Sequence, residues 1–155
     1  MRSVPLAAVH DVPRPQARLL LVEDEVTTMF AMREFFAISG FDVDCAAAAD
    51  EAIALLDRRI YDAVITDLHL TAHRCGEGLK VAWHARRRHP GSCIVMLTGF
   101  ETETTEEAAH RCGVDMYQTK PVELSHVCSY VDLALSRNRG AAGRLRELEP
   151  KWRQH

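Results

Sequence analysis

The sequence predicts an α/β fold: a five-stranded parallel sheet, doubly wound, with helices on both faces. Short apolar runs alternate along the chain with longer amphipathic stretches, which is the pattern of parallel strands joined by crossover helices. Hydrophobic residues make up 47% and charged residues 26% of the 155 residues, which is the ordinary balance of a globular domain with a substantial core.

Five apolar runs define the strands. Residues 18–23 (RLLLVE) form a short apolar run flanked by charge, typical of a strand buried on both faces. Four further runs follow in regular alternation, and right-handed crossovers fix the handedness of the units. The expected strands are residues 18–23, 41–46, 63–67, 93–98 and 116–118.

Helical spacing and stop signals predict the connecting helices. In the first helix apolar residues recur at helical spacing, and Gly40 provides the stop. The basic run at residues 86–89 indicates a solvated helix end, favourable beside the negative helix pole. The apolar positions of the first helix are Val26, Met29, Phe30, Phe36 and Ala37. The expected helices are residues 26–39, 49–59, 78–89, 103–112 and 122–136.

Composition separates a central domain, residues 18–136, from two short ends. The central residues hold 19 acidic and 11 basic side chains, and this negative excess does not favour a nucleic-acid partner. Residues 1–17 contain three prolines, which suggests a flexible leader. Residues 137–155 form a basic tail, in which Leu145 and Leu148 suit either a continued helix or disorder.

The cysteines and the hydropathy pattern predict a cytoplasmic protein. The five cysteines are an odd number without a Cys-x-x-Cys pair, which argues against a disulfide framework and a zinc ribbon. Free thiols are expected in a reducing compartment. No apolar run approaches the ~20 residues that a membrane-spanning helix needs, and no secretory signal is evident near the start, so no membrane association is expected.

Chemically active side chains stand at the ends of the predicted strands. In an open α/β sheet the carboxyl ends of the strands meet at one edge, where function gathers near the reversal of strand order. Three acids, a hydroxyl and a lysine there would suit a divalent cation and a phosphoryl group. These residues are Glu23, Asp24, Asp67, Thr98 and Lys120.

Four motifs at these positions resemble the receiver domain of two-component response regulators. They are the VEDE acid pair, VITDLHL around Asp67, MLTG ending in Thr98-Gly99 and YQTKP ending in Lys120-Pro121. The resemblance covers residues 18–136 and implies the flavodoxin-like strand order 2-1-3-4-5. It implies a phosphoacceptor signalling protein rather than an enzyme acting on external substrates. The donor would be a sensor histidine kinase or a histidine phosphotransfer protein.

The resemblance also implies a magnesium site and a nucleophile. Mg²⁺ prefers oxygen ligands and keeps several waters. Asp67 would attack the phosphoryl group, and Lys120 and Thr98 would each donate to a phosphoryl oxygen. A cis peptide bond before Pro121 would help to aim Lys120, as in the family. The ligands of the cation would be Glu23 (through water), Asp24, Asp67 and the backbone carbonyl of His69.

Three further positions concern switching and the lifetime of the phosphoryl group. Tyr117 matches the aromatic residue that fills a gap when Thr98 is drawn inward on phosphorylation. Phe100 and His69 occupy positions that tune dephosphorylation, and the bulky ring of Phe100 predicts slow loss of the phosphoryl group.

The loop after Asp67 departs from the family pattern. It is longer than usual, and Thr71 occupies the usual proline site. His69, His73 and Cys75 lie close together in this loop, but no fourth ligand is evident, so a separate metal site is not expected.

The sequence therefore predicts a single-domain response regulator that signals to an unknown target protein. Its partner-binding face would comprise the fourth helix, the fifth strand and the fifth helix, and a homodimer is left open. A receiver module of a hybrid kinase or a phosphorelay shuttle is the alternative. A Mg²⁺-dependent phosphatase would usually place a second Asp where this chain has His69, and a nucleotide- or flavin-binding domain would need a G-x-G-x-x-G that is missing after the first strand.

Overall fold

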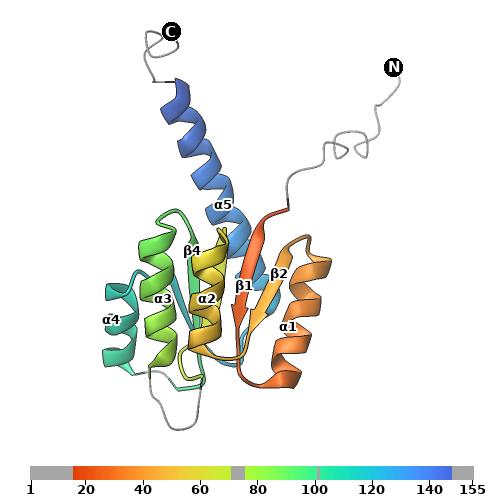
Figure 1. Ribbon diagram of the computed structural model, residues 1–155, viewed down its shortest axis with the longest axis vertical. Helices are drawn as coiled ribbons and strands as arrows, with labels where there is room; N and C mark the ends of the chain where they lie inside the picture. The colour runs from red at the N-terminus through yellow and green to blue at the C-terminus, as the bar shows by residue number, and fades with distance from the viewer. Residues whose placement is uncertain (1–15, 71–75, 101, 148–155) are drawn as a thin grey trace.

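The computed structural model shows a five-stranded parallel sheet in the order β2-β1-β3-β4-β5, which confirms the predicted topology (Figure 1). It describes residues 16–70, 76–100 and 102–147, with side chains up to residue 138. The strands are β1 (Arg18–Val22), β2 (Asp42–Ala46), β3 (Ala63–Asp67), β4 (Cys93–Thr98) and β5 (Met116–Thr119). The helices are α1 (Val26–Ile38), α2 (Ala49–Arg58), α3 (Glu77–Arg88), α4 (Glu103–Arg111) and α5 (Leu124–Glu147).

Helices cover both faces of the sheet (Figure 1). On one face α2, α3 and α4 pack around a core that includes Leu56 and Val64. On the other face α1 and α5 pack around a core that includes Phe36, Ile65 and Val131. Neighbouring residues of a strand point to opposite faces, so the central strands contribute to both cores.

The apolar runs predict the strands well because the sheet is buried on both faces. Every residue of β3 and of β4, two strands in the interior of the sheet, is buried. The edge strands β2 and β5 are only partly buried. Each observed strand begins and ends within one residue of its expected bounds.

The expected apolar face of α1 is partly wrong. Val26 and Phe30 are 72% and 63% exposed, whereas the buried side chains are Met32 and Phe36, with Met29 packed beside them. Apolar residues occur around most of this helix, so spacing alone does not choose one face. The position of α1 over the sheet makes that choice and leaves three large apolar side chains of the helix, Val26, Phe30 and Ile38, in solvent.

The fifth helix is longer than expected. It begins at Leu124 and runs to Glu147, so the first part of the basic tail continues α5 and does not form a separate segment. The helix projects past the edge of the sheet at which β1 begins (Figure 1). Residues 148–155 lie outside the described part of the chain, as do residues 1–15 of the expected leader. Among the helices of the described residues, each is too short or too polar to cross a membrane.

The basic run at the end of α3 is only partly solvated, which corrects the expectation of a simple solvated helix end. Arg87 stacks over the ring of Trp83, at 4.6 Å from its centroid. Arg88 pairs with the exposed Asp57 of α2 at 3.2 Å. Arg86 is mostly covered, and its guanidinium group donates hydrogen bonds to several neighbouring backbone carbonyls and pairs with Asp115.

Candidate functional site

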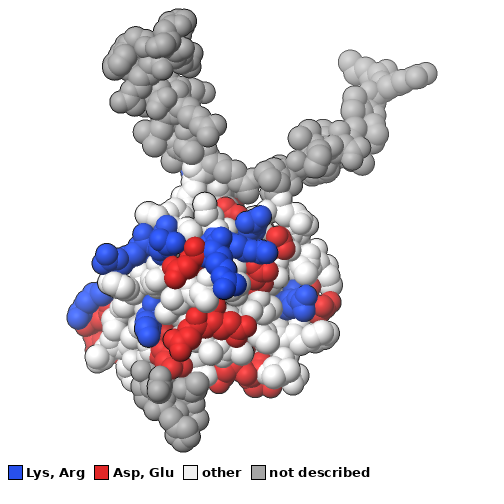
Figure 2. Space-filling view, in the orientation of Figure 1, with Lys and Arg blue, Asp and Glu red and all other residues white. Residues whose placement is uncertain are grey.

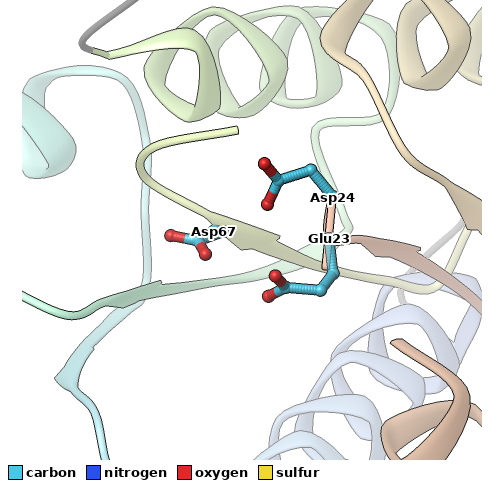
Figure 3. Close-up of side chains that lie close together, drawn as sticks. All are labelled: Glu23, Asp24 and Asp67. Carbon is cyan, nitrogen blue, oxygen red and sulfur yellow. The ribbon is translucent and has the colours of Figure 1, made fainter. Parts of the chain in front are cut away.

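Three carboxyl groups lie together where β1 and β3 end. Asp67 is the last residue of β3, and Glu23 and Asp24 follow β1 directly. One carboxylate oxygen from each lies within 4.8 Å of the others. Figure 3 shows the three carboxyl groups around one space, two from the end of β1 and one from the end of β3. The adjacency of β1 and β3 in the sheet brings residues 44 positions apart into one cluster.

Burial makes this cluster electrostatically costly. Glu23 and Asp67 are buried, at 3% and 8% exposure, while Asp24 is exposed. Burial raises the pKa of Glu23, and the neighbouring Asp67 raises it further, although Lys120 opposes both effects. The fold therefore holds two buried carboxyl groups close together, and a nearby positive charge would reduce their mutual repulsion.

Lys120 supplies part of that positive charge. Its Nζ lies 2.8 Å from Asp67 Oδ2 and 3.2 Å from Glu23 Oε2. Burial alone would lower the pKa of Lys120, but its bonds to Asp67 and Glu23 raise the pKa above the ordinary value. The backbone N–H of Lys120 donates to the carbonyl of Thr98, and the Lys120–Pro121 bond is cis, as expected.

Thr98 ends β4 at the same edge of the sheet. Its side chain is fully buried. Its hydroxyl donates to the carbonyl of Phe100 at 2.9 Å and accepts from the Phe100 N–H at 3.2 Å. The hydroxyl is thus held by the backbone that follows β4, whereas the Phe100 ring is 72% exposed.

His69 contacts the acidic cluster through its backbone. Its N–H donates to Asp67 Oδ1 at 3.2 Å, and the residue is half-buried. Residues 71–75 lie outside the described chain, and with them Thr71, His73 and Cys75. Within the described residues, the acidic cluster is the only group of three or more potential metal ligands.

Tyr117 lies in β5, half-buried against α4. Its hydroxyl lies 2.9 Å from Oγ1 of Thr105, in the first turn of that helix. Tyr117 does not join the acidic cluster, and it contacts the core on the α2–α3–α4 face.

Two residues position the site without having been predicted to do so. A Cβ on Gly78 would lie 2.0 Å from the carbonyl oxygen of Asp67, so only glycine lets α3 begin against the end of β3. Glu25 accepts the N–H groups of Thr27 and Thr28 and so caps α1. The glycine was visible as the first residue of the expected third helix, but the close approach depends on the packing of α3.

The donor set of the cluster fits a hard divalent cation. All three side chains offer carboxylate oxygens, which Mg²⁺ and Ca²⁺ prefer. Three carboxylates face a single ammonium group, so negative charge remains in excess when Lys120 is counted. This is also an arrangement in which a phosphoryl group could be held, provided that cations neutralise its oxygens.

The fold and the site together define a doubly wound α/β domain with an acidic pocket at the carboxyl edge of its sheet. Residues 19–132 match the response regulator receiver domain, and the chain belongs to this family of two-component signalling domains.

Curated relatives are longer regulators. The chain is 32% identical over 106 residues to the alginate biosynthesis transcriptional regulatory protein AlgB of Pseudomonas aeruginosa, a match that covers 68% of this chain and 23% of the relative. It is 33% identical over 110 residues to the transcriptional regulatory protein TcrA of Mycobacterium tuberculosis, covering 71% of this chain and 42% of the relative. The chain therefore spans less than half of the length of these two proteins.

Solved structures share the fold. A CheY-like receiver domain protein of Methanospirillum hungatei has a TM-score of 0.76 at 22% identity, covering 82% of this chain and 99% of that one. A response regulator of Burkholderia pseudomallei, solved with a phosphorylated aspartic acid, calcium ion and citrate, has a TM-score of 0.70 at 22% identity, covering 82% of this chain and 73% of that one.

Proposed function

We propose that Asp67 accepts a phosphoryl group from the phosphohistidine of a histidine kinase or a histidine phosphotransfer protein. The observation that carries this proposal is the buried Asp67 carboxylate, with Glu23 and Asp24 beside it and the Lys120 ammonium 2.8 Å away. In the transfer an Asp67 oxygen forms a bond to phosphorus, the P–N bond to histidine breaks, and the released imidazole takes up a proton. The product is an aspartyl phosphate.

The neighbouring residues would position and neutralise the transferred group. Lys120 already contacts Asp67 and would donate to one phosphoryl oxygen, while the Thr98 hydroxyl would donate to another. Mg²⁺, when bound, would supply positive charge to the phosphoryl oxygens. Its ligands would be Asp24, Asp67, the His69 carbonyl and, through water, Glu23.

Phosphorylation would then change the face made by α4, β5 and α5. The Thr98 hydroxyl, now held by the Phe100 backbone, would turn toward the new phosphoryl group. Tyr117 would move into the space that Thr98 leaves. Phe100 and His69, which flank the pocket, are proposed to tune dephosphorylation.

We propose that the receiver signals to a separate cytoplasmic target protein as a single-domain regulator, with residues 18–136 as the domain. A receiver module of a hybrid kinase or a phosphorelay shuttle is the alternative. The curated relatives are longer transcriptional regulators, which supports a receiver within a larger protein without favouring either of these two kinds. No nucleic-acid contact is proposed for the receiver.

The decisive experiment is a phosphorylation assay. The protein is incubated with Mg²⁺ and a small acyl phosphate donor, and intact mass is measured. We expect a gain of one phosphoryl group that disappears in Asp67→Asn and persists in Asp132→Asn, an exposed control on α5. No gain in the wild-type protein would contradict the proposal, and steady hydrolysis of external phosphomonoesters would favour a phosphatase.

The exposed apolar residues of α1 provide a test of the protein donor. Val26 and Phe30 stand one helical turn apart, beside an apolar groove of about 380 Å³ that reaches Lys120 and is lined by Thr28, Ala31 and Pro121 among others. A helical phosphodonor protein could bury these side chains while it presents its histidine to Asp67. Phe30→Ala should therefore slow transfer from the kinase about tenfold or more without slowing transfer from the small acyl phosphate. Ile38→Ala, at the far end of α1, is the matched control; equal slowing with both donors would contradict this role.

A further inference from the structure

A hydrogen bond joins the switch tyrosine to the first turn of α4. The hydroxyl oxygen of Tyr117 lies 2.9 Å from Oγ1 of Thr105, twelve residues earlier in the chain. Tyr117 belongs to β5 and Thr105 to α4, so the bond crosses between two elements of the face proposed to change on phosphorylation.

Thr105 is also the third residue of α4 and closes the capping box of that helix. Its hydroxyl donates to the carbonyl of Thr102 at 2.8 Å and accepts from the Thr102 N–H at 3.1 Å. The Thr102 side chain in turn accepts from the Thr105 N–H. A threonine hydroxyl has one proton and two lone pairs. The Thr105 hydroxyl oxygen also lies 3.0 Å from Oγ1 of Thr102, and either hydroxyl of the Thr105–Tyr117 pair can serve as the donor.

The helix that carries this bond is held weakly by packing. Among the nine residues of α4, all of which the structure describes, Ala109 alone is buried. The N-cap of α4, Thr102, lies two residues after Phe100, whose backbone holds the Thr98 hydroxyl. The Thr98 hydroxyl is therefore bonded to the backbone just before α4, and the Tyr117 hydroxyl to the first turn of that helix.

We propose that Thr105 is a positioning residue for Tyr117, which it ties to the capping box of α4 in the unphosphorylated protein. This inference rests on the proposed switch at Thr98 and Tyr117. Inward movement of the tyrosine breaks the Tyr117–Thr105 hydrogen bond, which we call the tie, so the Thr105 hydroxyl opposes the phosphorylated arrangement. The same movement loosens the first turn of α4, which links the pocket to the partner-binding face.

The first test measures the affinity for the beryllium fluoride anion, a phosphoryl mimic, in the presence of Mg²⁺. Loss of one net hydrogen bond from the unphosphorylated state should tighten this affinity roughly two- to tenfold. We expect this in both Thr105→Val and Tyr117→Phe, and we expect the double variant to be no tighter than either single variant, since both remove the same bond. Thr105→Ser keeps the hydroxyl and should restore the wild-type affinity.

The control separates the tie from helix capping. Thr102→Ala disrupts the capping box but leaves both hydroxyls of the tie, so it should not tighten binding of the mimic. The proposal is overturned if Thr105→Val has no effect at all, or if its effect is the same in the wild-type protein and in the Tyr117→Phe variant.

The second test needs no phosphorylation. Hydrogen exchange of the backbone amides in the first turn of α4 should be faster in Tyr117→Phe than in the wild-type protein, although the aromatic ring is kept. Unchanged exchange would overturn the tie even if Asp67 is phosphorylated normally. Faster exchange in a protein that never accepts a phosphoryl group would support the tie and contradict only the proposed function.

Discussion

The two edges of the sheet use similar charged residues for different purposes. At the carboxyl edge, the ammonium group of Lys120 pairs with Glu23 and Asp67, and Asp24 lies beside them, so negative charge is in excess. At the amino edge, Arg86 and Asp115 pair at 2.7 Å and balance each other. On the face shown in Figure 2, acidic side chains are prominent toward the carboxyl edge, at the bottom of the view.

The amino edge is saturated with hydrogen bonds. Each of the five N–H groups of Arg86 donates, to the carbonyls of Pro90, Ser92 and Gly113 and to the Asp115 carboxylate. The same Asp115 oxygen accepts the N–H of Ile94. All five N–H groups of Arg86 are used in the balanced cluster, whereas the cluster at the carboxyl edge keeps an excess of negative charge that a cation would neutralise. This is the difference expected between a structural charge cluster and a candidate functional one.

Among the variants that test this difference between the two edges, Gly78→Ala is expected to have the largest effect. The new Cβ would lie 2.0 Å from the carbonyl oxygen of Asp67, so α3 or the end of β3 must shift. We expect a loss of roughly 3–5 kcal/mol in the free energy of unfolding, measured by urea denaturation, together with slower phosphorylation of Asp67. Gly91→Ala, where a Cβ meets nothing within 4 Å, is the control at the opposite edge and should change stability by less than about 0.5 kcal/mol. Similar losses for the two variants would refute the steric explanation.

Breaking the balanced cluster should cost stability but not function. Arg86→Met leaves the carbonyls of Ser92 and Gly113 without their donor and Asp115 without its cation. We expect a loss of about 2–3 kcal/mol in the free energy of unfolding, with the phosphorylation rate of the folded protein unchanged. Arg87→Met, which removes only the exposed stack on Trp83, should cost less than about 1 kcal/mol. A slower phosphoryl transfer in Arg86→Met would show that the two edges are coupled.

Reducing the excess charge at the carboxyl edge should stabilise the fold in the absence of divalent cations. The raised pKa of Glu23 means that the folded protein retains a proton that the unfolded chain has already released. The free energy of unfolding therefore falls as pH rises from the ordinary value of 4.5 through the raised pKa. Glu23→Gln should remove this decrease and be more stable near neutral pH by on the order of 1 kcal/mol.

Urea unfolding at a series of pH values checks this expectation. The advantage of Glu23→Gln should vanish below pH 4.5, where Glu23 is protonated in both states. Adding Mg²⁺ should stabilise the wild-type protein more than the variant. A variant that is less stable than the wild-type protein near neutral pH would mean that the Lys120–Glu23 pair outweighs the cost of burial.

Most of the fold can be predicted from patterns of apolar residues that are local along the chain. The runs ending at Asp67 and Thr98 are apolar throughout, because central parallel strands are covered on both faces, and their bounds were predicted without error. The buried face of α1 was not predicted correctly, because Val26 and Phe30 are exposed but are as apolar as the residues that are buried. The roles of Arg86 and Thr105 were missed because their partners are distant in sequence and include backbone carbonyls, which no motif records.

The sequence by itself determined the strand order expected for the family, the residues at the strand ends and the edge at which they meet. The strand ends follow from short continuous apolar runs, which are local along the chain, and the strand order is implied by the resemblance of the motifs to the family. Only the tertiary structure decided how the charges are paired. It placed Lys120 between Asp67 and Glu23, and it set Tyr117 against Thr105. Such pairings depend on the packing of separate elements to within about an ångström, because hydrogen bonds form only over a narrow range of distance.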